Sequence, residues 1–178
     1  MRERSFLSNP PSSKIIPQWS LEDAHDALSL KESLESLPPR EVALVTLYLV
    51  AITTGNRASE LAAIDRRSIS FPPDDKSLVL PVVPGSIFKN QTPNRAPNPI
   101  NILCLGGSML CPVGALQLYL AQTSGPIAHK LFLNPVSNTP LIASTLSLWS
   151  YKSINYLLPD AICKGHDTRK LKFFFGLD

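Results

Sequence analysis

The chain has 178 residues, a hydrophobic content of 44% and a formal net charge of +3. This length suits one domain that buries about two-thirds of its unfolded surface, and this apolar content excludes a disordered chain. Residues 1–56 carry five basic and seven acidic side chains, whereas residues 57–178 carry twelve and seven. The mild basic excess of the second part permits an anionic partner without requiring one.

The composition also argues against secretion, membrane insertion and metal binding. The first eleven residues have charge but no apolar core of a signal peptide, and no apolar stretch reaches transmembrane length. The three cysteines lack paired Cys-x-x-Cys spacing, and only three scattered histidines accompany them. We therefore expect reduced, half-buried thiols in a soluble, intracellular protein with no metal, cofactor or membrane contact.

The chain is expected to begin with a flexible, proline-containing lead over residues 1–19, followed by a single domain over residues 20–178. Ser20 is a predicted helix cap, with acidic residues next to it that favour the helix N-terminus. The helical spacing of Leu21, Ala24 and Leu28 predicts a helix that continues up to the Pro38–Pro39 pair.

The next predicted helix runs roughly from Pro39 to Thr54. Its residues from Val42 to Ile52 are apolar except for one threonine, which indicates a buried core helix too short to span a bilayer. Gly55 is the expected stop, because glycine accepts the left-handed backbone that a helix end often needs.

A region of strand character follows. β-Branched and apolar residues bounded by Pro, Asp and Gly predict strands at Ser68–Phe71, Ser77–Val83 and Ile100–Leu105. The segment Gly85–Thr92 between the last two strands is interpreted as a hairpin with a long polar arm.

Two further helices and a final helical turn are predicted from apolar spacing and breaker residues. Pro112 marks the start of the first, and Thr145 is expected to cap a second that ends before Pro159. The tail from Lys164 to Leu171 is expected to open a last helix.

The corner at Thr53–Leu61 concentrates the functional signal. Arg57 lies between the buried helix and a second helical turn, and a rigidly held guanidinium presents a planar set of donors that suits two phosphate oxygens. The alternative is an ordinary i,i+3 pair between Arg57 and Glu60. The local pattern does not distinguish the two.

Four motifs occur in an order that resembles the catalytic domain of tyrosine recombinases, the phage-integrase-like enzymes that break and rejoin DNA. They are the Thr-Gly-x-Arg-x-Ser-Glu-Leu corner at 54–61, Phe-Lys-Asn-Gln at 88–91, Cys-Pro-Val-x-Ala-Leu at 111–116 and His-x-x-Arg at 166–169. The wording of the third and fourth motifs is most similar to recombinases of eukaryotic mobile elements of the DIRS or Crypton kind.

This resemblance implies an α+β fold, mainly helical with a small antiparallel sheet, and a catalytic role for four residues. Arg57 and Arg169 would clamp the scissile phosphate without a metal ion. Lys89 would protonate the leaving 5′ oxygen, and His166 would act as an acid, base or hydrogen-bond donor. Glu60 would brace the arginine corner.

Four other basic residues would contact backbone phosphates and give salt-sensitive, sequence-independent binding. They are Arg66, Arg67, Arg95 and Lys170. Without the resemblance, these side chains and Lys89 are ordinary surface charge, and His166 is a helix-cap residue.

The family attacks DNA through a tyrosine beyond the His-x-x-Arg motif. No tyrosine follows Arg169 in this sequence, and the four tyrosines present are expected to be core or rim residues. The front end also lacks the residues for the family's N-terminal clamp domain. We therefore expect a recombinase core that is incomplete at its C-terminus and does not cleave DNA alone.

The expected partner is DNA, with homo-oligomers on DNA formed by the complete protein. The expected location is the nucleus in a eukaryote and the cytoplasm otherwise. A DNA-binding or regulatory module derived from the same fold is the alternative. A plain helical interaction domain is a third hypothesis, in which the four motif residues lie on separate faces.

Overall fold

The computed structural model describes residues 18–71, 77–86, 100–106, 108–123, 129–165 and 167–168. Within these ranges the chain has the expected α+β class, with five α-helices, a short 3-10 helix and a two-stranded antiparallel sheet. In chain order the elements are α1 (Leu21–Ser29), α2 (Pro39–Thr54), α3 (Ala58–Leu61), η1 (Arg66–Ser68), β1 (Ser77–Leu80), β2 (Ile100–Leu103), α4 (Pro112–Gln122) and α5 (Ala143–Leu157). The lead expected over residues 1–19 lies, up to residue 17, outside the described residues.

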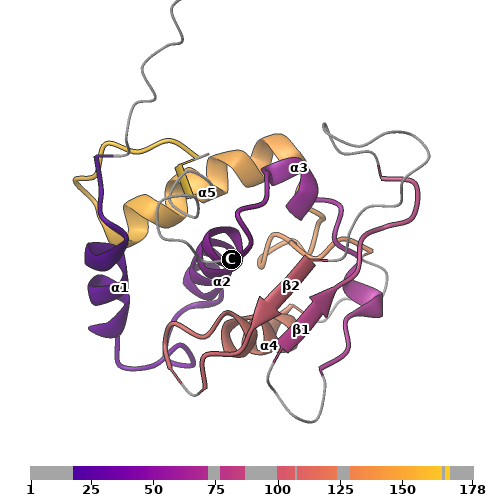
Figure 1. Cartoon of the computed structure of the whole chain (residues 1–178), viewed down its shortest axis with the longest axis horizontal. Coiled ribbons are helices and arrows are strands. Elements are labelled where there is room, and N and C mark those ends of the chain that lie inside the picture. The colour runs from indigo at the N-terminus through magenta and orange to yellow at the C-terminus, as the bar shows by residue number, and fades with distance from the viewer. Residues whose placement is uncertain are drawn as a thin grey trace, which may run out of the picture.

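Helix α2 is the centre of the fold, and its predicted bounds are confirmed. Every residue from Val42 to Ile52 is buried, as a helix that is apolar around its whole circumference requires. Figure 1 shows α2 in the middle of the molecule, with α1, α4, α5 and the sheet around it. The hydroxyl of Thr46 donates a hydrogen bond to the carbonyl oxygen of Ala115 in α4 at 3.1 Å, so this polar side chain is satisfied inside the core.

Helix α1 begins where the sequence predicts but ends earlier. The Ser20 hydroxyl accepts hydrogen bonds from the backbone N–H groups of Glu22 and Asp23. The expected continuation up to Pro38 is wrong, because the helix ends at Ser29. In the turn that follows, Ser36 donates from its N–H and from its hydroxyl to Ser33. Serines that bond to nearby backbone favour turns over helix.

The sheet consists of two of the three predicted strands. β1 and β2 pair antiparallel, with Leu78 opposite Ile102, and alternate residues of both strands are buried. The strand expected at Ser68–Phe71 is wrong, because the chain there leaves the 3-10 helix η1, which is capped by the side chain of Asp65. β1 stops at Leu80 because Pro81 has no N–H for the ladder. Residues 87–99, which include most of the expected hairpin arm, lie outside the described residues.

The two later helices differ from expectation at one boundary. α4 starts at Pro112 as predicted, whereas α5 starts two residues before the expected cap Thr145, which therefore lies inside the helix. The N–H of Leu141 donates to the carbonyl oxygen of Phe132 at 2.8 Å, which holds the chain next to the helix start. α5 ends before Pro159 as predicted.

Other expectations concern single residue types. None of the three cysteines is in a disulfide; Cys104 and Cys163 are half-buried, as expected, and Cys111 is buried. Of the tail from Lys164 to Leu171 that was expected to open a last helix, residues 164, 165, 167 and 168 are described. Residues 164 and 165 are not helical, whereas residues 167 and 168 are helical and buried. None of the helices in the described ranges combines the length and the apolar character needed to cross a membrane.

Candidate functional site

The arginine corner is built by local backbone chemistry at the end of α2. Gly55 has a left-handed backbone with a φ of 64°, and its N–H donates to the carbonyl oxygen of Ala51. The hydroxyl of Thr54 donates to the carbonyl oxygen of Val50 at 2.7 Å and accepts from the N–H of Asn56 at 3.3 Å. The chain then extends through Arg57, which is the N-cap of α3. A helix stop and a helix start only four residues apart hold this backbone in one conformation.

Glu60 holds the backbone of Arg57, not its side chain. One carboxylate oxygen of Glu60 accepts a hydrogen bond from the Arg57 N–H at 2.7 Å. The side-chain pair between Arg57 and Glu60, which the sequence left open, is not formed. Within the described part of the chain, the half-buried guanidinium of Arg57 has no hydrogen-bond or ion-pair partner. Toward the described residues, the donors of its guanidinium are unused.

Arg66 is engaged in the fold. Its guanidinium donates to the hydroxyl of Thr123 and to the carbonyl oxygen of Leu120, both at 3.0 Å. These groups lie at the C-terminal end of α4, where carbonyl oxygens have no partner within the helix and a cation is favoured. Burial lowers the pKa of Arg66. The side chain thus links the segment after α3 to the end of α4. Two of its hydrogen-bond donors are used in this contact.

Arg67 is paired with a buried carboxylate. Its guanidinium contacts both oxygens of Asp65, at 3.1 and 2.9 Å, and its N–H also donates to Asp65. The Arg67 side chain is 55% exposed, whereas that of Asp65 is 6% exposed. The hydrogen bonds from Arg67 lower the pKa of the Asp65 carboxyl, against the opposing effect of burial. An exposed guanidinium held by a carboxylate has a defined direction but a neutralised charge.

Replacing Asp65 by asparagine is expected to lower the free energy of unfolding by about 1 kcal/mol at pH 7, because a charged acceptor is lost. The folded pKa of Asp65 lies below its unfolded value, so its contribution is complete above about pH 3.9 and is lost as the pH falls through the folded value. Urea unfolding at neutral and strongly acidic pH tests this. The difference in free energy of unfolding between wild type and variant should disappear in acid. A difference that persists there contradicts the prediction. Asp160→Asn, an exposed site after α5, should stay within about 0.5 kcal/mol.

The other site residues predicted from sequence lie outside the described residues. They are Lys89, Arg95, His166, Arg169 and Lys170. Asp167 and Thr168, which lie between His166 and Arg169 in the sequence, are described. Both are buried, with 3% and 2% of their surface exposed. A carboxylate oxygen of Asp167 accepts from the N–H of Lys164 at 2.7 Å, which caps this turn.

The segment before the His-x-x-Arg motif lies directly on α5. A Cβ atom added to Gly165 would lie 2.2 Å from the carbonyl oxygen of Ser147, so only glycine fits this approach. Helix α3, which is preceded by its N-cap Arg57, also packs against α5. The arginine corner and the beginning of the tail therefore contact the same helix, although Arg57 and Gly165 are far apart in sequence.

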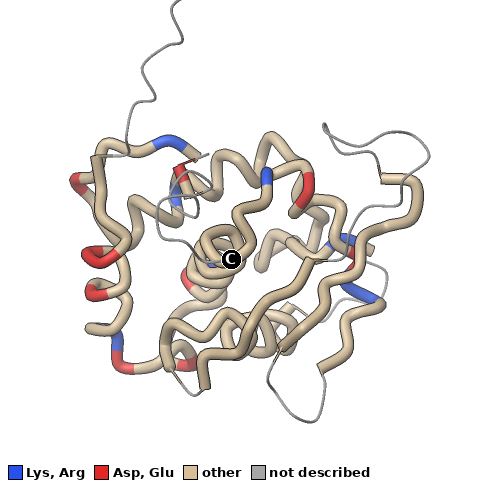
Figure 2. Tube along the Cα trace, in the orientation of Figure 1, with Lys and Arg blue, Asp and Glu red and all other residues tan. Residues whose placement is uncertain are grey.

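Comparisons with protein-family models, with curated proteins and with solved structures give no match for this chain. The family resemblance therefore rests on the four motifs in the sequence. Within the described ranges no group of three or more His, Cys, Asp or Glu side chains is arranged to hold a metal ion. Figure 2 shows the lysines and arginines along the chain.

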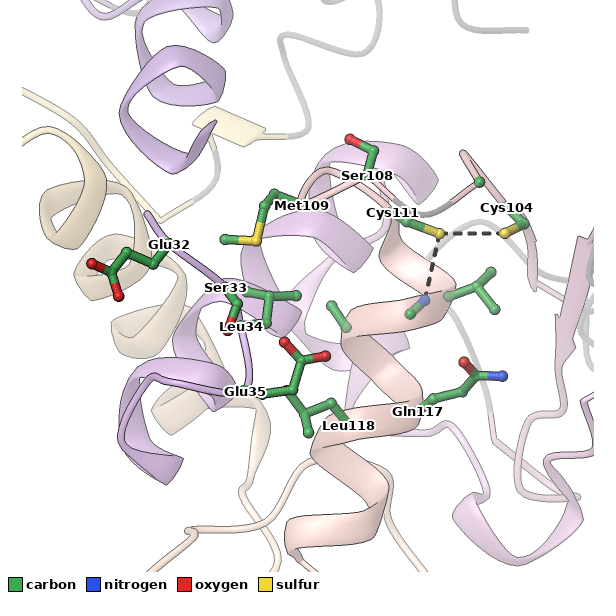
Figure 3. A pocket seen from close by; sticks show the side chains of 14 residues that line it. Glu32, Ser33, Leu34, Glu35, Cys104, Ser108, Met109, Cys111, Gln117 and Leu118 are labelled. Carbon is green, nitrogen blue, oxygen red and sulfur yellow. Dashed lines mark hydrogen bonds between the residues drawn. The ribbon is translucent and has the colours of Figure 1, made fainter. Parts of the chain in front are cut away.

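Sequence reasoning missed a second candidate site. A pocket of about 670 Å³ lies between residues 32–35 and the N-terminal half of α4, and both Cys104 and Cys111 line it (Figure 3). The sequence signal was two cysteines seven residues apart, on either side of Gly106–Gly107. That spacing matches no common motif, so it predicted no contact between them.

Proposed function

We propose that this chain is the DNA-binding core of a site-specific DNA recombinase of the tyrosine-recombinase type. Arg57 and Arg169 would bind the two non-bridging oxygens of a backbone phosphate, with Lys89 and His166 beside them for proton transfer. Arg67, Arg95 and Lys170 would contact flanking phosphates. Arg66 and Arg67 would contribute less, because the guanidinium of Arg66 already bonds to the end of α4 and that of Arg67 is paired with Asp65.

The observation that carries the proposal is the state of Arg57. Its backbone is held by Glu60 and by the end of α2, while its guanidinium has no partner in the described part of the chain. The fixed backbone gives the side chain a defined starting point, and ordering its remaining rotamers on a phosphate costs about 0.5–1.5 kcal/mol. The shared contact of the arginine corner and residue 165 with α5 supports a common site for the first and fourth motifs.

The tyrosine environments favour DNA binding without covalent chemistry by these 178 residues. Tyr48 and Tyr119 are fully buried, and burial raises the pKa of both hydroxyls. The hydroxyl of Tyr156 donates to Glu41. Tyr151 is 41% exposed, but it precedes the His-x-x-Arg motif by fifteen residues and so does not match the family's nucleophile. We therefore keep, as a second candidate, a DNA-binding module that has the fold without the cleavage reaction.

Binding of a short DNA duplex is expected to weaken steeply as salt rises, by about 0.9 logarithmic units per neutralised phosphate for each tenfold change in salt. Fluorescence anisotropy over a series of ionic strengths measures this slope. An affinity that is independent of salt contradicts the proposal, as does the absence of binding at low salt. Incubation of these 178 residues with nicked DNA should give no covalent adduct under either candidate, because no tyrosine follows Arg169. The candidates differ in a chain extended by a segment that carries a tyrosine: loss of cleavage in Arg57→Ala and Lys89→Ala would support the enzyme, and unchanged behaviour would support the module.

A further inference from the structure

Two cysteines from different elements meet at the start of α4. Cys104 directly follows β2, and Cys111 is the N-cap of α4. Their sulfur atoms lie 3.4 Å apart (Figure 3). Gly106 has a φ of 52°, a left-handed conformation that lets the short connection fold back on itself. The two thiols therefore have the proximity that a disulfide requires.

The surroundings of Cys111 favour its thiolate. Its sulfur accepts hydrogen bonds from the N–H of Leu105 at 3.3 Å and the N–H of Gly114 at 3.5 Å. It also lies at the N-terminus of an eleven-residue helix, where the helix dipole stabilises a negative charge. Burial alone would raise the pKa of Cys111, but these N–H groups and the Cys104 thiol outweigh it and lower the pKa. Cys111 is thus the nucleophilic member of the pair.

The pocket gives small molecules access to this pair. Its volume of about 670 Å³ is ample for a small oxidant. Glu32 and Glu35 line the opposite side (Figure 3), and these carboxylates disfavour an anionic oxidant such as a glutathione disulfide. A neutral peroxide meets no such repulsion.

We propose that Cys104 and Cys111 form a redox-active dithiol that hydrogen peroxide converts reversibly into an intramolecular disulfide. The Cys111 thiolate attacks one peroxide oxygen, the O–O bond breaks, and a sulfenic acid and water form after one proton is taken up. The Cys104 sulfur then attacks the Cys111 sulfur, the S–O bond breaks, and a second water leaves with the Cys104 proton. In total, one dithiol and one peroxide give one disulfide and two waters. A small dithiol reductant reverses the change by thiol–disulfide exchange.

Cys163 provides an internal control in the same chain. Its sulfur donates to the side-chain oxygen of Asn155 at 3.0 Å. Burial raises the pKa of Cys163, and the nearby Asp167 carboxylate adds to this effect. Its thiol should therefore remain reduced under conditions that oxidise the pair.

The test is peroxide treatment of the purified chain, followed by quenching, alkylation and intact-mass and peptide analysis. We expect a loss of two hydrogen atoms, one alkylated cysteine that maps to Cys163, and a peptide cross-linked between Cys104 and Cys111. Treatment with a small dithiol should restore three alkylated cysteines. Three thiols that persist at the end of the reaction, or a cross-link that includes Cys163, would overturn the proposal.

Variants assign the order of the steps. Cys163→Ser should form the same disulfide as the wild type. Cys104→Ser should stop at a sulfenic acid on Cys111, which dimedone traps, because the second sulfur is missing. If dimedone labels Cys104 in Cys111→Ser as fast as it labels Cys111 in Cys104→Ser, the nucleophilic role of Cys111 is wrong. Because the wild-type measurement needs no substitution, the outcome does not depend on whether the variants fold.

Discussion

Replacing Arg57 by alanine is expected to weaken the binding of a short DNA duplex by about ten-fold or more, since a charge-assisted pair of hydrogen bonds to phosphate is lost. The slope of affinity against salt should also fall by about one unit, the signature of one lost phosphate contact. Stability should change little, because the guanidinium has no partner in the described part of the chain. Fluorescence anisotropy over a salt series and thermal unfolding measure the two effects separately.

Arg40→Ala is the matched control for this experiment. Arg40 is exposed in the first turn of α2, whereas Arg57 follows the last turn, so the same charge is removed at the opposite end of one helix. A loss of affinity that is equal in the two variants would mean that binding follows net charge only, and the proposed phosphate site would be wrong. Arg57→Lys should recover part of the affinity, because lysine keeps the charge but not the planar set of donors.

Replacing Gly165 by alanine is expected to displace the turn at residues 164–168 from α5 and to lower the free energy of unfolding by about 1–3 kcal/mol, as overpacking in a tight contact does. The added Cβ would lie 2.2 Å from the backbone carbonyl oxygen of Ser147, and backbone cannot rotate away as a flexible side chain does. Urea unfolding gives the loss of stability. Hydrogen exchange should become faster in the variant at Asp167 and Thr168, which are buried in the wild type.

Gly114→Ala separates this steric effect from the general effect of adding a methyl group. A Cβ at Gly114 would meet Cys111 at 3.8 Å, an ordinary contact, and the residue lies within α4. This variant should be stabilised by about 0.5–1 kcal/mol, because alanine favours helix over glycine. If Gly165→Ala were as stable as the wild type and bound DNA equally well, the contact with α5 would not position the tail.

The bounds of α2 and the start of α4 were predictable, because neighbours in sequence supply the signal there. Pro39 starts α2 and Gly55 ends it, because the first lacks an N–H and the second accepts a left-handed backbone. Predictions failed where a local pattern had two solutions. The spacing that begins at Leu21 suited a longer helix, but α1 ends at Ser29 and a turn with serine hydrogen bonds follows at 33–36.

The candidate site was predictable in residue type but not in geometry. Arg57 was singled out because it lies between two helices. The sequence did not show that Glu60 would bond to the backbone N–H of Arg57 and not to its guanidinium. Arg66 and Arg67 look equivalent in sequence, and they differ because one reaches the end of α4 and the other reaches Asp65.

The sequence by itself determined the class of the fold, the buried helix α2, the corner that presents Arg57 and the four motifs behind the proposed function. These properties depend on backbone preferences and apolar spacing within a few residues. Only the tertiary structure decided that Cys104 meets Cys111, that Gly165 lies on Ser147 and that Arg66 is tied to α4. Such contacts follow from how elements pack, and packing joins residues whose local patterns contain no information about one another.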